Sequence, residues 1–202
     1  MIIFFIIILL FSITFHEYAH GWVAYKLGDL TAKYSGRLTL NPIAHIDPFG
    51  TIILPILLLI ISKGSFAFGY AKPIPINPYH FKNPKKDIKW VGLAGTVANL
   101  FLAFILALAI KTGLPLPLKA FILGILINVA LAVFNLIPIP PLDGSRIMAS
   151  LLPNEMANKY LKLEPYGYFI IIFLMLIGFF HWFILPIVSI ITSYLLGAKV
   201  II

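Results

Sequence analysis

Residues 16–20 read H-E-Y-A-H, which places two imidazoles four positions apart with a carboxylate directly after the first. On a helix, positions i and i+4 lie one above the other on the same face, so His16 and His20 can bind one metal ion. Glu17, about 100° around such a helix, can reach a water bound to that metal. Two nitrogens and a carboxylate with one position left open suit zinc. The pattern therefore predicts a hydrolytic zinc site.

The alternative is that His16 and His20 are polar residues packed between helices. The surrounding residues are apolar, and three ionisable groups within five residues of an apolar helix cost several kcal/mol unless they are paired or bind a ligand. A metal site is the better explanation.

A third ligand must come from elsewhere in the chain. Asp143 stands out because it follows a long apolar run and a Pro-rich stretch, residues 135–144. Irregular backbone near membrane depth is tolerated only where it is buried in protein or lines a wet cavity, so a carboxylate there should have a partner. Alternatively, Asp143 caps a short helix over residues 145–152, a role compatible with ligation. The candidates for the third ligand are Asp29, His45, Asp47, His80 and Asp143.

The amino-acid composition indicates whether these residues lie in a soluble protein or in a membrane protein. Of 202 residues, 61% are hydrophobic and 11% charged, whereas soluble chains carry about 25% charged residues. The chain is therefore an integral membrane protein, in contact with the lipid bilayer. The absence of cysteine excludes disulfides and thiolate ligands. The net charge of +8 is spread through short loops between apolar runs, which argues for orientation in a bilayer and against nucleic acid as a partner.

Apolar runs long enough for a transmembrane helix, about 20 residues, locate the spans. Residues 1–25, 90–110 and 119–137 qualify, and residues 166–180 and 182–196 predict a closing helical hairpin that turns near His181. Residues 51–62 are apolar but short and contain Pro55. We expect one domain over residues 1–202, with a core at 1–152 and the C-terminal hairpin at 166–202.

Residues 64–77 follow a different pattern. Phe66, Phe68 and Tyr70 alternate with small residues, and Pro73 and Pro75 then remove two amide donors. This predicts a short β-hairpin or edge strand, which either captures an extended peptide at its edge or packs only on its own neighbours. The predicted fold is thus an all-α polytopic membrane protein with about five transmembrane helices, a re-entrant or membrane-embedded segment at 51–62 and a short β-hairpin.

The positions of the ligands constrain the topology. His16 and His20 lie in the C-terminal half of the first span, and Asp143 follows the C-terminal end of the span over residues 119–137. They can meet only if both helices run in the same direction, which requires that residues 51–62 do not cross the membrane. That arrangement also places every Lys and Arg except Lys111 and Lys119 on one side. By the positive-inside rule, the site then lies toward the cytoplasmic face.

Three motifs together resemble the site-2 proteases, a family of intramembrane zinc metalloproteases. They are H-E-x-x-H at 16–20, N-x-x-P-x-P-x-x-D-G at 135–144, and a Gly-rich span at 92–99 that ends in Asn, with Thr96 where the family usually has Pro. The resemblance implies that His16, His20 and Asp143 bind one Zn²⁺ per chain and that Glu17 is the general base. It implies transmembrane protein substrates, regulated intramembrane proteolysis, a multi-pass protein of a prokaryotic cell membrane, and the small branch of the family without PDZ or CBS domains.

Further polar residues could support such a site. Asn99 or Asn135 could donate to the developing oxyanion, although interhelical hydrogen bonds are an alternative for Asn99 and for Asn128. His45 or Asp47 could orient His16 or His20, or could belong to a plain turn.

A second class of function uses the same ligands. A membrane metal transporter or metal-binding protein would also place His16, His20 and Asp143 around an ion. A transporter needs further polar groups along a path to the opposite face, and the spans supply none beyond Asn and Thr. Intramembrane endopeptidase is therefore the favoured function.

Overall fold

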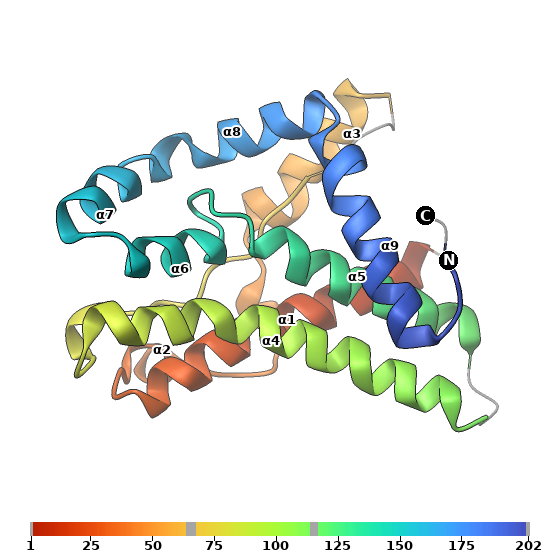
Figure 1. The fold of residues 1–202 in the computed structure, drawn as a ribbon, viewed down its shortest axis with the longest axis horizontal. Helices are drawn as coiled ribbons and strands as arrows, with labels where there is room; N and C mark the ends of the chain where they lie inside the picture. The colour runs from red at the N-terminus through yellow and green to blue at the C-terminus, as the bar shows by residue number, and fades with distance from the viewer. Residues whose placement is uncertain (1, 64–67, 114–116, 201–202) are drawn as a thin grey trace.

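The computed structural model describes residues 2–63, 68–113 and 117–200, and these residues form helices and connecting segments without a strand (Figure 1). The long helices are α1 (Ile2–Lys26), α4 (Pro84–Lys111) and α5 (Leu118–Asn135). The shorter α-helices are α2 (Thr31–Tyr34), α3 (Leu54–Ile61), α6 (Asp143–Leu151), α7 (Asn154–Leu161), α8 (Glu164–Leu176) and α9 (Leu185–Leu196). Single turns of other helix types are η1 (Pro42–His45), η2 (Pro48–Ile53), η3 (Pro78–His80) and η4 (Phe180–Ile184).

Helix α4 is the central helix, and it packs most extensively against α5, α1 and α6. The reason lies in the small side chains on its buried face, because small residues let helix backbones approach closely within a membrane. The small residues buried along α4 are Gly92, Ala94, Gly95, Thr96, Ala98, Ala103 and Ala107.

Helices α1 and α5 run in the same direction, and α4 runs opposite to both (Figure 1). The C-terminal ends of α1 and α5 therefore lie toward the same end of the molecule, as the convergence of the predicted ligands requires. Beyond α5, the chain passes through an irregular Pro-rich loop into α6.

Within residues 2–63, 68–113 and 117–200, three helices are long and apolar enough to cross a membrane, and they confirm three of the predicted spans: Phe4–Lys26, Pro84–Lys111 and Leu118–Asn135. The apolar helix Pro48–Ile61 is shorter than a span, as expected for residues 51–62. It consists of the π-helical turn η2 followed by α3.

The predicted C-terminal helical hairpin is wrong. Residues 164–176 and 180–196 form a pair bent by 75°, which counts at most as one broken span, so the described residues hold three or four candidate spans. The physical reason is length, because α8 has 13 residues and the second helix consists of η4 with 5 residues and α9 with 12, so neither reaches the roughly 20 that a crossing needs. Gly178, with φ +84°, makes the break between them.

The predicted β-hairpin is also absent from the described residues. Residues 68–77, here called the extended segment, form no strand, and residues 64–67 lie outside the described residues. Pro73 and Pro75 lack the amide hydrogens that a ladder needs. From Tyr70 to Ile74, every second backbone N–H instead donates to another part of the chain, and each donor–acceptor distance is 3.0 Å. The three bonds run from Tyr70 N to Gly50 O, from Lys72 N to His45 O, and from Ile74 N to Glu17 Oε2.

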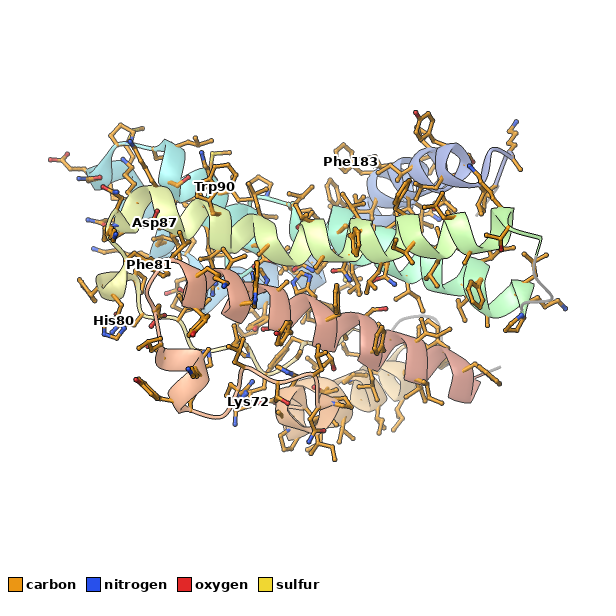
Figure 2. All side chains as sticks on the ribbon, turned by 90° about the horizontal axis from the view of Figure 1, so that it is seen from below. Lys72, His80, Phe81, Asp87, Trp90 and Phe183 are labelled. Carbon is orange, nitrogen blue, oxygen red and sulfur yellow. The ribbon has the colours of Figure 1, made fainter. Side chains whose placement is uncertain are left out.

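The end of the extended segment is anchored by a buried carboxylate, Asp29. One oxygen accepts a hydrogen bond from Nδ1 of His80 at 2.9 Å and from the backbone N–H of Thr31 at 3.0 Å, and the other accepts from Asn77 N at 2.7 Å. Figure 2 shows His80 at the end of the bundle where α1 ends and α4 begins. Burial alone would raise the pKa of Asp29, but the hydrogen bonds, led by that from the Thr31 side chain, hold it below its ordinary value.

Asp29→Asn should lower the free energy of unfolding by about 1–3 kcal/mol. The asparagine has an NH₂ group where the aspartate has its second oxygen, and this group would face at least one of the N–H groups that now donate to Asp29. The depressed pKa means that the carboxylate stabilises the fold above its unfolded pKa of about 3.8 and loses this effect as the pH falls through its folded value. Denaturant titration in detergent should therefore show a gap between wild type and variant that is full above pH 5 and shrinks on acidification below about pH 4.

The matched control is Asp87→Asn, because Asp87 is only partly buried and accepts one hydrogen bond, from Asn83 N at 2.9 Å, that an amide oxygen can also accept. We expect it to change stability by less than about 0.5 kcal/mol. Equal effects of the two substitutions would contradict the anchoring role of Asp29.

Candidate active site

Three predicted ligands meet where α1 faces the start of α6. Nε2 of His16 lies 3.1 Å from Oδ2 of Asp143, Nε2 of His20 lies 3.0 Å from the same oxygen, and the two Nε2 atoms are 3.0 Å apart. All three side chains are buried. Among the described residues, this is the single cluster of three or more His, Asp or Glu side chains with the spacing of a metal site.

The hydrogen bonds behind the imidazoles determine where their protons are. Nδ1 of His16 lies 2.6 Å from the amide oxygen of Asn99, and Nδ1 of His20 lies 2.6 Å from the carbonyl oxygen of Val91. Both oxygens can only accept, so each Nδ1 carries the hydrogen and each neutral imidazole presents an Nε2 lone pair. Such second contacts are typical of histidines that bind a metal.

The orientation of Asn99 is set by a buried polar network. Its amide nitrogen donates to Oδ1 of Asn128 at 2.8 Å and to the carbonyl of Ser12 at 3.3 Å, so its oxygen is the atom that faces His16. Asn128 in turn donates to Oγ of Ser12 at 2.9 Å. These are the interhelical hydrogen bonds that were the alternative for Asn99 and Asn128, and they leave Asn99 no amide hydrogen for an oxyanion.

The three ligand atoms form an arrangement that fits a cation. Two imidazole nitrogens and a carboxylate oxygen lie about 3 Å apart, and Oδ2 of Asp143 is buried with no hydrogen-bond donor among the described residues. Ligands about 2.0–2.1 Å from a tetrahedral zinc lie roughly 3.3 Å from one another, close to these separations. A Cβ on Gly95 would collide with Nε2 of both His16 and His20, so only glycine leaves this space open.

Asp143 is positioned by the backbone around it. Helix α6 begins at Asp143 itself rather than at Ser145, so its N-cap residue is Leu142, and no backbone N–H of the described residues donates to Oδ2 of Asp143. The predicted capping alternative is therefore wrong. Glycine is required at position 144, where a Cβ would collide with the carbonyl of Leu136. Gly92 of α4 packs closely on the same turn, because a Cβ there would lie 3.2 Å from the carbonyl of Asp143.

Glu17 and the three ligands line a cavity of about 270 Å³, whose walls also include parts of the extended segment, α5 and α8. Oε2 of Glu17 accepts a hydrogen bond from Ile74 N, so the extended segment fixes the carboxylate against this cavity. Asn135 lines the cavity as well, and its amide nitrogen donates to the carbonyl of Leu131 at 3.0 Å.

The other four candidates for the third ligand lie elsewhere. Asp29 and His80 are bonded to each other, as described above. Nε2 of His45 donates to the carbonyl of Thr39 at 2.9 Å, and Asp47 accepts from Gly50 N at 2.6 Å. His45 and Asp47 therefore belong to turns, the plainer of their two predicted roles.

Three residues at the site were missed by sequence analysis. Arg146 lines the cavity one helical turn after Asp143, and that spacing was a usable signal. Tyr168 lines it from α8, and Ser12 joins the network behind His16. Neither Tyr168 nor Ser12 belongs to a local pattern that marks it.

Comparisons with known proteins agree on one family. The profile of peptidase family M50 matches residues 111–178. YwhC of Bacillus subtilis is 45% identical over 185 residues, which cover 85% of this chain and 78% of that protein. Rip2 of Mycolicibacterium smegmatis is 31% identical over 172 residues, covering 83% of this chain and 64% of the relative. MJ0611 of Methanocaldococcus jannaschii is 34% identical over 143 residues, which cover 66% of this chain and 63% of that protein.

The names of these three relatives each describe a candidate zinc metalloprotease. No solved structure gives a significant match. The identity to YwhC extends over most of both chains, and the buried His-His-Asp cluster is the kind of site that a zinc metalloprotease needs. The chain therefore belongs to peptidase family M50, the family of the site-2 proteases.

Proposed function

We propose that this protein is an intramembrane zinc endopeptidase that hydrolyses peptide bonds in or near the transmembrane segments of other membrane proteins. One zinc ion is held by His16, His20 and Asp143, and Glu17 is the general base. The observation that carries the proposal is the group of three buried ligand atoms about 3 Å apart, beside a carboxylate that lines the same cavity.

Zinc in such a site lowers the pKa of a bound water toward about 7 and polarises the carbonyl of the scissile bond. The residues of the chain do the rest. Oε2 of Glu17 is held by the N–H of Ile74, which fixes the carboxylate while Oε1 accepts the proton of the attacking water. Glu17 then delivers that proton to the leaving amine.

The distribution of charge supports a site toward the cytoplasmic face. His16 and His20 lie in the C-terminal half of α1, and the end of α1 and the start of α4 lie at the same end of the molecule (Figure 1). Cytoplasmic segments carry an excess of Lys and Arg. The basic residues around the start of α4 are Lys82, Lys85, Lys86 and Lys89.

The extended segment supports capture of an unwound substrate. One edge is occupied by its bonds to neighbouring elements, whereas the amides of Gly69 and Ala71 donate to no described residue and both residues line the cavity. An extended peptide pairing with this free edge would lie beside Glu17. A helical substrate must unwind before hydrolysis, and this edge offers hydrogen bonds to the unwound form.

The transporter alternative lacks support. Beyond the site, toward the N-terminal end of α1, a cluster of buried apolar residues joins α4, α5, η4 and α9, and apolar side chains do not favour the passage of an ion. Its members are Ala103, Ala107, Ile125, Val129, Ile184 and Val188.

The decisive experiment replaces Glu17 by Gln. The zinc ligands stay in place, so we expect the purified variant to keep its zinc while cleavage of a model transmembrane peptide falls about 10²–10⁴-fold. Zinc content by atomic absorption and cleavage by mass spectrometry provide the two readings. Glu155→Gln, an exposed residue on α7, is the matched control and should cut like wild type. If Glu17→Gln cleaves as fast as wild type, the proposed mechanism is wrong.

Gly95→Ala tests the metal site without changing a ligand. The added methyl would occupy the space between the two Nε2 atoms, so we expect at least a 100-fold loss of zinc affinity in chelator competition. Gly124→Ala is the control, because there the nearest atom is the flexible end of the Leu106 side chain. Normal zinc affinity in Gly95→Ala would mean that the ion binds elsewhere.

Ala71→Pro removes one amide of the free edge. Because one hydrogen bond contributes about 0.5–1.5 kcal/mol, kcat/KM should fall about 3- to 10-fold. Ala71→Gly keeps the amide and serves as control. An equal loss in both variants would speak against capture at this edge.

A further inference from the structure

We propose that Tyr168 donates a hydrogen bond to the carbonyl oxygen of the scissile bond as that oxygen becomes an oxyanion. The inference rests on the proposed function. It begins from a hydroxyl in the cavity wall that the general-base mechanism leaves unused.

The backbone at Tyr168 is held against the loop that precedes Asp143. The neighbouring Gly167 packs directly on the carbonyl of Pro140, and a Cβ at this position would overlap that oxygen. Ile171, one turn later on α8, is almost fully buried in a core cluster with Leu142. The position of Tyr168 is therefore coupled to the backbone that positions Asp143.

The ring of Tyr168 is also fixed from its other side. It stacks on Tyr70 of the extended segment, with ring centroids 4.7 Å apart and an interplanar angle of 27°, and it meets Phe68 at 6.4 Å in a tilted arrangement. The ring of Tyr70 in turn lies against Gly50, where a Cβ would collide with it. Stacked aromatic rings of this kind hold one another in a defined orientation.

The hydroxyl of Tyr168 is the unused group. It forms no hydrogen bond with any described residue, although the side chain is partly buried and lines the cavity together with Glu17. Tyr168 and the proposed general base Glu17 line the same cavity, and no hydrogen bond joins the two described side chains. Buried tyrosine hydroxyls usually have a partner. We infer that its partner is the substrate.

The reaction needs such a donor. When the water oxygen bonds to the carbonyl carbon, the electrons of the C=O double bond move to oxygen while Glu17 takes the proton. When the C–N bond breaks, those electrons re-form the carbonyl, and the proton passes from Glu17 to the amine nitrogen. His16, His20 and Asp143 act as ligands throughout, and the proton that Glu17 takes goes to the amine nitrogen, so none of these four residues donates to the oxyanion.

Tyr168 supplies the missing hydrogen bond without giving up its proton. A phenol has an ordinary pKa of about 10, so it remains a donor at neutral pH. Its bond to the carbonyl strengthens as negative charge develops, and such interactions raise kcat rather than lower KM. Asn135 also lines the cavity, and one of its two amide hydrogens is bonded to its own helix.

The test is Tyr168→Phe in the full-length, zinc-loaded protein in lipid nanodiscs. The hydroxyl bonds to nothing within the described residues, so we expect thermal stability and zinc content to match wild type. With a fluorogenic transmembrane peptide, kcat should fall about 10- to 1000-fold while KM changes less than about 3-fold. Affinity for a phosphinic peptide, which mimics the tetrahedral state, should fall by a similar factor. Tyr166→Phe, exposed and two residues earlier on α8, is the control.

Other outcomes would overturn the inference. An unchanged kcat, a loss confined to KM, or a loss of zinc or thermal stability in Tyr168→Phe would each show that the hydroxyl does not act on the transition state. Each of these results requires an active wild type. If the wild-type protein binds zinc and cuts no peptide, the proposed function itself fails, and this inference fails with it.

Discussion

The structure depends on three electron-rich ligand atoms that repel one another inside a membrane-spanning bundle of helices. The lone pairs of His16 and His20 and a carboxylate oxygen of Asp143 face one another at about 3 Å, and the hydrogens of both imidazoles are turned away toward Asn99 and Val91. In an apolar medium, this arrangement is costly unless a cation lies among the three atoms. Zinc binding would therefore hold α1 and α6 together as well as provide the chemistry.

Helix α4 makes this close approach possible. Gly95 leaves space for the ion and Gly92 admits the backbone of α6, so the absence of two side chains brings ligands from distant parts of the chain together. The same helix contributes Asn99 and the carbonyl of Val91, which orient the two imidazoles. One helix thus determines both the spacing of the ligands and their protonation. At Gly92 and Gly95, close helix packing and space for a metal ion both favour a residue without a side chain.

The extended segment and α8 form the substrate side of the site. The extended segment fixes Glu17 through the amide of Ile74, and the stacked rings of Tyr70 and Tyr168 join it to α8. Asp29 holds its far end through Asn77. Turns and side chains, rather than a neighbouring strand, thus occupy one edge of the segment. Its other edge borders the cavity beside the proposed general base.

The sequence by itself determined the features that depend on neighbouring residues. The spacing of His16 and His20 identifies one helix face, and the length of an apolar run identifies a span, because both follow from local helix geometry. Only the tertiary structure decided which of the five candidates for the third ligand lies beside His16 and His20, and this residue is Asp143. It likewise replaced a hairpin and a strand with a bent pair and an extended segment, and it brought Tyr168 into the cavity. These features depend on packing between segments that are distant in the sequence. A local sequence pattern does not show which hydrogen bonds such segments form or how closely they approach one another.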